Sequence, residues 1–303
     1  MSRTLILSLL VLSKCLLFTG CTGPDTDGAT DGATDGATDG ATDGATDGDS
    51  AWLDGGSVTE TAVTHPNPCA PGSRLGDPTG STSFATSAGT TIIVRTPAAY
   101  DPLVASPLLV MYSGATFTAA MTESDTRLTE PATGSGYIIA YVDHLVPNMD
   151  ANIKEAAAAV SSVQGAWCIN PKRIYLSGHS DGASMTHLVV LEGLVTAAAI
   201  APSASGLRVD AEMVCVPHPL PLLELHSKDD AMFPVTDGYG AEVAQWFATC
   251  AGCGAPSAPD ESGCIVYSAC AVGSPVTYCE GTGEHGSWPF ERSQQILNFF
   301  ARF

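Results

Sequence analysis

Short apolar runs alternate with helix-like segments along most of this chain, and this alternation restricts the folds that it can adopt. Residues 108–112 are a continuous apolar run, which is typical of a strand covered on both faces. Residues 152–163 are rich in alanine, with apolar residues at helical spacing. The pattern predicts one α/β domain, a mostly parallel sheet with helices on both faces. We expect strands at residues 91–95, 108–112, 137–142, 173–176, 197–201 and 220–225, and helices at 152–163, 183–194, 240–249 and 291–300.

The composition predicts a folded body with an acidic surface. Hydrophobic residues make up 45% of the 303 residues and charged residues 15%, so a sizeable core can form. The formal net charge is −20, and a surface of that charge repels the phosphates of nucleic acid. We therefore expect no nucleic-acid partner.

The first 21 residues have the features of an export signal. Arg3 precedes an apolar run at residues 4–12, which is too short to span a bilayer. The segment Leu17-Phe18-Thr19-Gly20-Cys21 resembles a bacterial lipobox, although Phe18 stands where leucine is usual. We expect a lipoprotein-type signal peptide at residues 1–21, with lipid on Cys21 anchoring the exported chain to a membrane of the cell envelope. The alternative is an ordinary secretory signal.

A Thr-Asp-Gly-Ala repeat follows the signal and runs from Thr26 to Ala45. Gly and Asp recur too often for a helix with an apolar face, and the like charges extend the strip. We expect a disordered acidic linker at residues 22–60 that holds a catalytic domain, residues 61–303, away from the membrane. A calcium loop at residues 25–28 is the alternative, but the later repeats lack its Asp-x-Asp spacing and no bidentate Glu follows.

The chain has ten cysteines, and eight remain once Cys15 leaves with the signal and Cys21 takes lipid. An even number in an exported protein predicts disulfide bonds, although their pairing cannot be deduced from the sequence. Cys250 and Cys253 form a C-x-x-C motif, for which zinc binding and redox chemistry are alternatives. No second pair has zinc-ribbon spacing and no thioredoxin-like strand precedes the motif, so we expect structural disulfides.

The sequence Gly178-His179-Ser180-Asp181-Gly182 fits the pattern G-x-S-x-G. A chain this rich in Gly and Ser can match that pattern by chance, but here a strand-like run leads in and a helix-like segment leads out. A nucleophile elbow requires that strand–turn–helix setting, with glycines leaving space around a sharply bent backbone. Ser180 is therefore a candidate nucleophile, and a glycine-rich turn with a solvated serine is the alternative.

A serine nucleophile needs a histidine base and an acid that orients the base, and in this architecture they follow in the order Ser, acid, His. His285 lies in a glycine-rich loop before the last helix-like segment, where an exposed base is expected. His187 lies about two helical turns after Ser180, and we expect it to point away. Asp229 and Asp230 both follow a strand-like run, and local physics does not separate them.

Residues from about 90 to 300 resemble the extracellular polyhydroxybutyrate depolymerase and feruloyl/acetylxylan esterase superfamily of α/β-hydrolases. The block at residues 173–186 resembles the elbow and the following helix of that family. Residues 225–234 resemble its H-G-x-x-D-x-x-V-P block, and this alignment selects Asp230 over Asp229. The resemblance implies the α/β-hydrolase fold.

The same resemblance assigns the remaining site residues. The segment from Cys279 onward resembles the C-x(5)-H-x-W-P region of the family, which supports His285 as base and places Trp288 at the pocket edge. The family's oxyanion strand usually ends in His-Gly, whereas here it ends in Tyr-Ser-Gly. Because an oxyanion hole uses backbone N–H groups, the expected donors are those of Ala115 and Asp181.

The resemblance implies a serine carboxylic ester hydrolase that works through an acyl-enzyme, without a metal or an organic cofactor. Its expected substrates are feruloyl or acetyl esters on polysaccharide fragments, which we favour, or hydroxyalkanoate oligoesters. Two alternatives remain open. One is a non-catalytic surface binding module of hydrolase fold, which the altered oxyanion strand supports. The other is a serine peptidase on the same fold.

Overall fold

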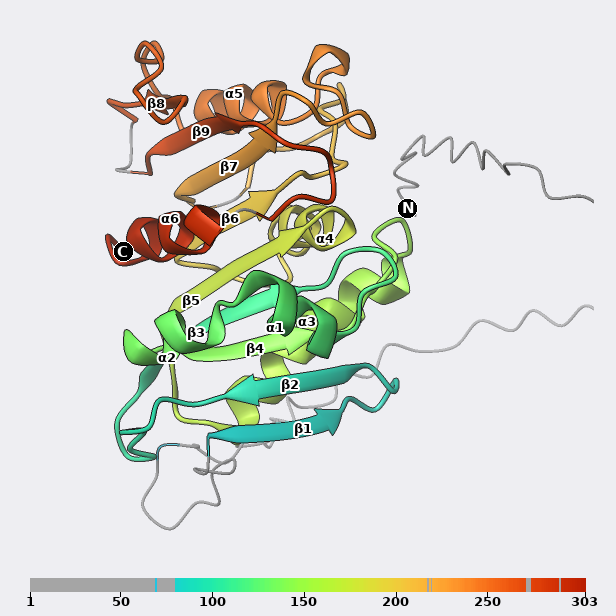
Figure 1. The fold of residues 1–303 in the computed structure, drawn as a ribbon, viewed down its shortest axis with the longest axis vertical. Coiled ribbons are helices and arrows are strands. Elements are labelled where there is room, and N and C mark those ends of the chain that lie inside the picture. The colour runs from blue at the N-terminus through green and yellow to red at the C-terminus, as the bar shows by residue number, and fades with distance from the viewer. Residues whose placement is uncertain (1–68, 70–79, 217, 219, 271–273, 289) are drawn as a thin grey trace, which may run out of the picture. The chain divides into compact units, whose positions relative to one another are not determined.

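The computed structural model describes residues 69, 80–216, 218, 220–270, 274–288 and 290–303 (Figure 1). All of them fall in one unit, Thr64–Phe303. The expected signal peptide, the lipid site Cys21 and the acidic linker lie outside the described residues. Within the part of the chain that is described, no helix is both long and apolar enough to cross a membrane.

A sheet of nine strands runs through the described domain in the order β1-β2-β4-β3-β5-β6-β7-β9-β8. The six strands from β4 to β9 in that order are parallel, while β1 and β2 at one edge and β8 at the other are antiparallel to their neighbours. The prediction of a mostly parallel sheet is therefore confirmed, with three more strands than the six expected. The strands are β1 Ser81–Ala85, β2 Thr91–Arg95, β3 Ser106–Tyr112, β4 Ile138–Val142, β5 Ile169–His179, β6 Ala199–Ser203, β7 Leu222–Ser227, β8 Cys264–Tyr267 and β9 Val276–Gly281.

Helices cover both faces of the sheet, as predicted. In Figure 1, α1, α2 and α6 lie on the face towards the viewer, while α3, α4 and α5 lie behind it. Successive strand residues point to opposite faces, so Leu108 and Val110 join the core under α3, α4 and α5, whereas Leu109 and Met111 join the core under α1, α2 and α6. The helices are α1 Ala119–Thr126, α2 Thr129–Gly134, α3 Asp150–Ala166, α4 Asp181–Leu191, α5 Ala241–Cys250 and α6 Phe290–Phe300, with a 3₁₀ turn η1 at Val235–Asp237.

The expected elements differ from the observed ones mainly at their ends. The strand expected at residues 173–176 extends as β5 through His179, and the helix expected at 183–194 begins as α4 at Asp181. The elbow therefore consists of a single residue, Ser180. Five elements had no sequence signal: β1, α1, α2, β8 and β9. They are short and partly polar, and pairing with neighbouring strands or packing on the sheet stabilises them more than their own apolar pattern.

Four disulfide bonds among the described residues confirm the prediction of structural disulfides. Cys250 and Cys253 bond to different partners, so the C-x-x-C motif is neither a zinc site nor a redox pair. Such bonds form and persist in oxidising compartments, which places this domain outside the cytoplasm. The pairs are Cys69–Cys168, Cys215–Cys250, Cys253–Cys270 and Cys264–Cys279.

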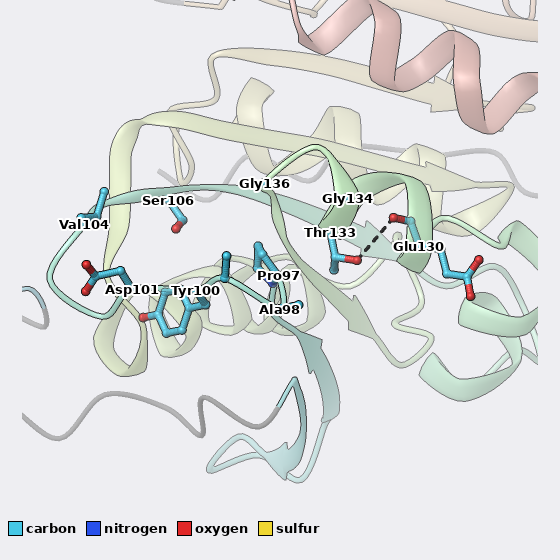
Figure 2. Close-up of a pocket in the computed structure, with 11 residues that line it drawn as sticks. Pro97, Ala98, Tyr100, Asp101, Val104, Ser106, Glu130, Thr133, Gly134 and Gly136 are labelled. Atoms are coloured by element: carbon cyan, nitrogen blue, oxygen red, sulfur yellow. Dashed lines mark hydrogen bonds between the residues drawn. The ribbon is translucent and has the colours of Figure 1, made fainter.

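A pocket of about 570 Å³ lies at the edge of the sheet where β3 begins. Figure 2 shows it between the segment after β2, which carries Pro97 and Tyr100, and the end of α2, which carries Thr133. The parallel strands run away from this edge, and their carboxyl ends meet at the opposite one. Catalytic groups of α/β sheets gather at the carboxyl ends, so the functional site is sought there.

Candidate active site

Ser180 occupies a sharp turn between β5 and α4. Its backbone has φ 57° and ψ −121°, a conformation that a residue with a side chain rarely adopts. The Ser180 N–H donates to the carbonyl oxygen of Ser203, 3.0 Å away at the end of the neighbouring strand β6. The side chain thus stands at the carboxyl edge of the sheet, with 8% of the residue exposed.

The two glycines of the motif are required by close backbone approach. A Cβ atom on Gly178 would lie 2.3 Å from the carbonyl oxygen of Gly182, and one on Gly182 would lie 2.1 Å from the carbonyl oxygen of Tyr112. Neither distance is compatible with a side chain, because the neighbours are backbone atoms that cannot move aside. The glycines therefore let α4 leave β5 directly beneath Ser180 and pack against the end of β3.

Ser180, His285 and Asp230 come together from three separate segments. His285 Nε2 lies 2.8 Å from Ser180 Oγ, and His285 Nδ1 lies 2.7 Å from Asp230 Oδ2. Both separations are hydrogen-bond distances. A carboxylate on Nδ1 holds the proton there, so Nε2 is left to accept the proton of the serine hydroxyl. The arrangement suits nucleophilic attack by Ser180 with His285 as general base.

Asp230 is buried in a turn whose N–H groups stabilise its negative charge. Its Oδ1 accepts hydrogen bonds from the N–H groups of Met232 and Phe233, at 2.9 and 2.8 Å. Burial alone would raise the pKa of the Asp230 carboxyl, but the hydrogen bonds from His285 and from these N–H groups outweigh it and lower that pKa. Asp230 is therefore held as the carboxylate that an imidazolium requires opposite it.

Asp229 takes a different position from its neighbour. Its Oδ2 accepts a hydrogen bond from the N–H of Gly283 at 3.2 Å, and the residue is exposed. Asp229 therefore contacts the loop that carries His285 but not the imidazole itself. Of the two acids that local physics left open, only Asp230 contacts the base.

The two segments that carry the expected oxyanion donors, the start of α4 and the loop after β3, lie close to Ser180. Asp181 is the first residue of α4, so its N–H has no acceptor within the helix. The loop after β3 passes close to the elbow, because a Cβ on Gly114 would lie 3.0 Å from the carbonyl oxygen of His179 and 3.6 Å from Ser180 Cβ. Ala115 follows Gly114 in this loop. Within the described residues its N–H donates to no protein acceptor.

His144 is a residue of this edge that sequence reasoning missed. It follows β4, and its Nε2 lies 2.9 Å from Asp181 Oδ2. The His144 N–H donates to the carbonyl oxygen of Phe117 at 3.3 Å, in the same loop as Ala115. His144 thus connects Asp181, the residue after Ser180, with the loop that carries Ala115. A lone histidine after a strand has no sequence signal of this kind, because the contact joins residues far apart in the chain.

Aromatic rings surround the imidazole of His285. Phe233 meets it edge to face, with ring centroids 5.0 Å apart. His179 lies on another side at 5.4 Å, and Trp288 packs edge-on against His179 at 5.8 Å. Trp288, which we expect at the pocket edge, contacts the ring of His179 and is partly exposed.

His187 is buried on the far side of α4 and lies away from Ser180, as expected. Its Nε2 lies 2.9 Å from Glu224 Oε2 in the centre of β7, and both side chains are fully buried. Its Nδ1 lies 3.1 Å from Ser205 Oγ. The pair stands outside the candidate site. Among the described residues no group of three His, Cys, Asp or Glu residues is placed to hold a metal ion.

The sheet order, the one-residue elbow after β5 and the acid and base after β7 and β9 define the α/β-hydrolase fold. Known proteins agree with this. Feruloyl esterase B of Piromyces equi is 26% identical over 238 residues, which cover 66% of this chain and 44% of that protein. The chain thus spans less than half the length of this curated relative. No family model matches the sequence.

Two solved structures share the fold. The acetyl xylan esterase from Aspergillus awamori has a TM-score of 0.56 at 12% identity, covering 73% of this chain and 98% of that one. An esterase from the Planctomycetes species Thermogutta terrifontis has a TM-score of 0.51 at 15% identity, covering 76% and 93%. At such low identity the likeness extends to the fold and no further.

Proposed function

We propose that the protein is a serine carboxylic ester hydrolase with Ser180 as nucleophile, His285 as general base and Asp230 as the acid that orients the base. The observation that carries the proposal is the continuous pair of hydrogen bonds, 2.7 and 2.8 Å, from Asp230 through His285 to Ser180 Oγ. The similarity to a feruloyl esterase and the fold shared with two esterases support an ester as the bond that is broken.

In acylation, Ser180 Oγ attacks the ester carbonyl carbon while its proton passes to His285 Nε2. The tetrahedral intermediate collapses, the bond to the alkoxide breaks, and His285 gives the proton to the departing alcohol. In deacylation, His285 takes a proton from water, the resulting hydroxide attacks the acyl carbon, and the proton returns to Ser180 Oγ as the carboxylic acid leaves. Asp230 remains ionised throughout and stabilises the imidazolium that forms in each step.

The negative charge of the tetrahedral intermediate requires donors beside Ser180. We assign this role to the N–H groups of Asp181 and Ala115, which lie in the helix start and in the loop that pack against the elbow. Donors fixed in this way need no reorganisation as the charge develops, and each is typically worth about 100- to 1,000-fold in rate. The Tyr-Ser-Gly ending of β3 is compatible with the role, because only backbone atoms donate.

The test is hydrolysis of p-nitrophenyl acetate and butyrate by the purified protein, together with labelling by a fluorophosphonate, which reacts with an activated serine. We expect both in the native protein and a loss of at least about 1,000-fold in kcat for Ser180→Ala. Labelling and hydrolysis that survive in Ser180→Ala would overturn the proposal.

The same experiment separates the other classes of function. A non-catalytic binding module would show neither labelling nor turnover. A serine peptidase would also be labelled, but it would in addition cleave peptide amides, which an ester hydrolase leaves intact. The geometry of the base favours catalysis over binding, because a binding module gains nothing from a buried carboxylate aligned on an imidazole.

For the substrate, we favour feruloyl or acetyl esters of polysaccharide fragments over hydroxyalkanoate oligoesters. Met232 is 62% exposed and precedes Phe233, which lies against His285, so an apolar surface adjoins the base. Such a surface suits an aromatic acyl group. The measurement is kcat/KM on methyl ferulate, acetylated xylo-oligosaccharide and hydroxybutyrate trimer. A trimer preferred by more than about tenfold, or about 1.4 kcal/mol in transition-state binding, would reverse the assignment.

We also propose that the chain is exported and anchored by lipid on Cys21, with the repeat as a spacer. The four disulfides support an oxidising location, and the lipobox-like segment supports the anchor. Partitioning of the expressed protein into a detergent phase, lost on Cys21→Ser, is the expected result. Equal partitioning of the variant would contradict the anchor.

A further inference from the structure

Arg292 is a buried cation without an acidic partner, close to the candidate site. It lies in the first turn of α6, and only 7% of the residue is exposed. None of the ion pairs among the described residues includes it. Burial lowers the pKa of the guanidinium to about 10. A buried, unpaired charge at the positive end of a helix is costly for folding, so its presence calls for a role.

The hydrogen bonds of Arg292 lead to the loop that carries His285. Its Nη1 donates to the carbonyl oxygen of Ser287 at 2.9 Å, two residues after the base. The same nitrogen donates to Ser203 Oγ at 2.9 Å. The guanidinium also lies over the ring of Trp288, 5.5 Å from its centroid. Arg292 therefore contacts the loop directly and, through Ser203, the end of β6.

Ser203 also forms a hydrogen bond with His179. Its Oγ lies 3.2 Å from His179 Nδ1, and His179 Nε2 lies 2.8 Å from the carbonyl oxygen of His285. A carbonyl only accepts, so Nε2 carries the proton and Nδ1 accepts from the Ser203 hydroxyl. That direction is available because Ser203 Oγ already accepts from Arg292. Arg292 thus donates to Ser203, and Ser203 donates to His179 Nδ1. His179 Nε2 in turn donates to the backbone carbonyl of His285.

Burial and the neighbouring positive charges keep His179 neutral beside His285. Burial, together with the positive charges of Arg292 and His285, lowers the pKa of His179 to about 3. The rings of His179 and His285 are 5.4 Å apart. A second positive charge at that distance would oppose the imidazolium that His285 becomes during the reaction.

We propose that Arg292 is a positioning residue for the base: acting through Ser203 and His179 on the carbonyl of His285, and directly on the carbonyl of Ser287, it fixes the glycine-rich loop in the reactive geometry. The proposal rests on the proposed function. The loop contains Gly283 and Gly286, so its backbone is intrinsically free and needs such contacts. A misplacement of the base by about 1 Å is enough to cost roughly 100-fold in rate.

The first measurement is fluorophosphonate labelling of the native protein, which separates the two proposals. If the native protein is not labelled, the proposed function fails; if it is labelled, the variants test Arg292. For Arg292→Ala we expect kcat to fall about 30- to 100-fold with KM changed less than about threefold, because the base and not the substrate is displaced. Arg302→Ala is the matched control, since Arg302 is exposed, lies just beyond the same helix and should leave kcat unchanged.

A purely structural role would not predict chemical rescue. Guanidinium ion at low millimolar concentration should restore part of kcat in Arg292→Ala, whereas ammonium ion at the same ionic strength should not. A variant with a lower melting temperature but native kcat well below that temperature would overturn the proposal.

If Arg292→Ala does not fold, Ser203→Ala decides the question. It removes the link to His179 while keeping the backbone carbonyl that accepts from Ser180. We expect a fall in kcat of about tenfold with a native melting temperature, and an unchanged kcat would overturn the proposal.

Discussion

Asp229 and Asp230 are neighbours in the chain but hold different parts of the loop that carries the base. Asp230 accepts from the ring of His285 at 2.7 Å, whereas Asp229 accepts from the backbone N–H of Gly283 at 3.2 Å. One residue of the turn after β7 therefore contacts the imidazole of His285, and its neighbour contacts the backbone two residues before His285.

The same substitution at these two positions should have very different effects on activity. For Asp230→Ala we expect kcat to fall about 1,000- to 10,000-fold, because the base loses both its orientation and its counter-charge. For Asp229→Ala we expect a loss below about tenfold, since water can replace an exposed acceptor. Steady-state kinetics on p-nitrophenyl butyrate measures both. Similar losses in the two variants would contradict the assignment of roles.

The lowered pKa of Asp230 predicts a pH dependence of stability. A carboxyl whose pKa is lower in the folded than in the unfolded state stabilises the fold above the unfolded value of about 3.9, and this contribution is lost as the pH falls through the folded pKa. Asp230→Asn lacks the titrating group. Urea unfolding from pH 6 to pH 3 should therefore give a difference between native protein and variant that shrinks below about pH 4. A difference that stays constant would show that Asp230 does not titrate in this way.

The glycines of the elbow should tolerate no side chain. Gly182→Ala and Gly178→Ala should each lower the free energy of unfolding by about 1–3 kcal/mol or more, because the new Cβ meets backbone atoms at 2.1 and 2.3 Å. Gly165→Ala is the control: this glycine lies in α3, and nothing lies within 4 Å of its Cβ position. It should raise the free energy of unfolding by about 0.5–1 kcal/mol. Equal effects at the three positions would contradict the close approach.

Removing one residue of the buried pair His187 and Glu224 should lower the free energy of unfolding, whereas replacing both by apolar residues should lower it much less. Glu224→Ala alone should lower the free energy of unfolding by about 3–5 kcal/mol, because it leaves the buried imidazole without its partner. Exchange of both residues for leucine should recover most of that loss. Chemical denaturation of the single and double variants measures the difference, and a double variant as unstable as the single one would show that the charges themselves stabilise the fold.

The disulfides should differ in what they contribute. Cys69–Cys168 closes a sequence separation of 99 residues and Cys264–Cys279 one of 15. By loop-closure entropy, replacing the first pair with alanine should lower the free energy of unfolding by about 4.7 kcal/mol and replacing the second by about 3 kcal/mol. Thermal or urea unfolding tests the order. A larger loss from the short loop would show that native contacts outweigh chain entropy.

The parallel core of the sheet was predictable because its signals are local. A continuous apolar run such as 108–112 specifies a strand buried on both faces wherever it lies in the chain. The elbow is local too, since Gly178 and Gly182 flank Ser180 within five residues. Edge strands β1 and β8 were missed, because what stabilises them is pairing with β2 and β9 and not their own pattern.

Contacts between segments that are distant in the chain, unlike these local features, could be identified only from the tertiary structure. The sequence alone determined the α/β class, the turn that carries Ser180, and the presence of disulfide-bonded cysteines in an acidic chain. It did not determine which cysteines pair, and local pattern did not separate Asp229 from Asp230, a choice that only the family resemblance made. It also did not reveal that Arg292 reaches His285 through Ser203 and His179. Each of these depends on side chains from separate elements meeting at one edge of the sheet, and local propensity and periodicity carry no information about that distance in space.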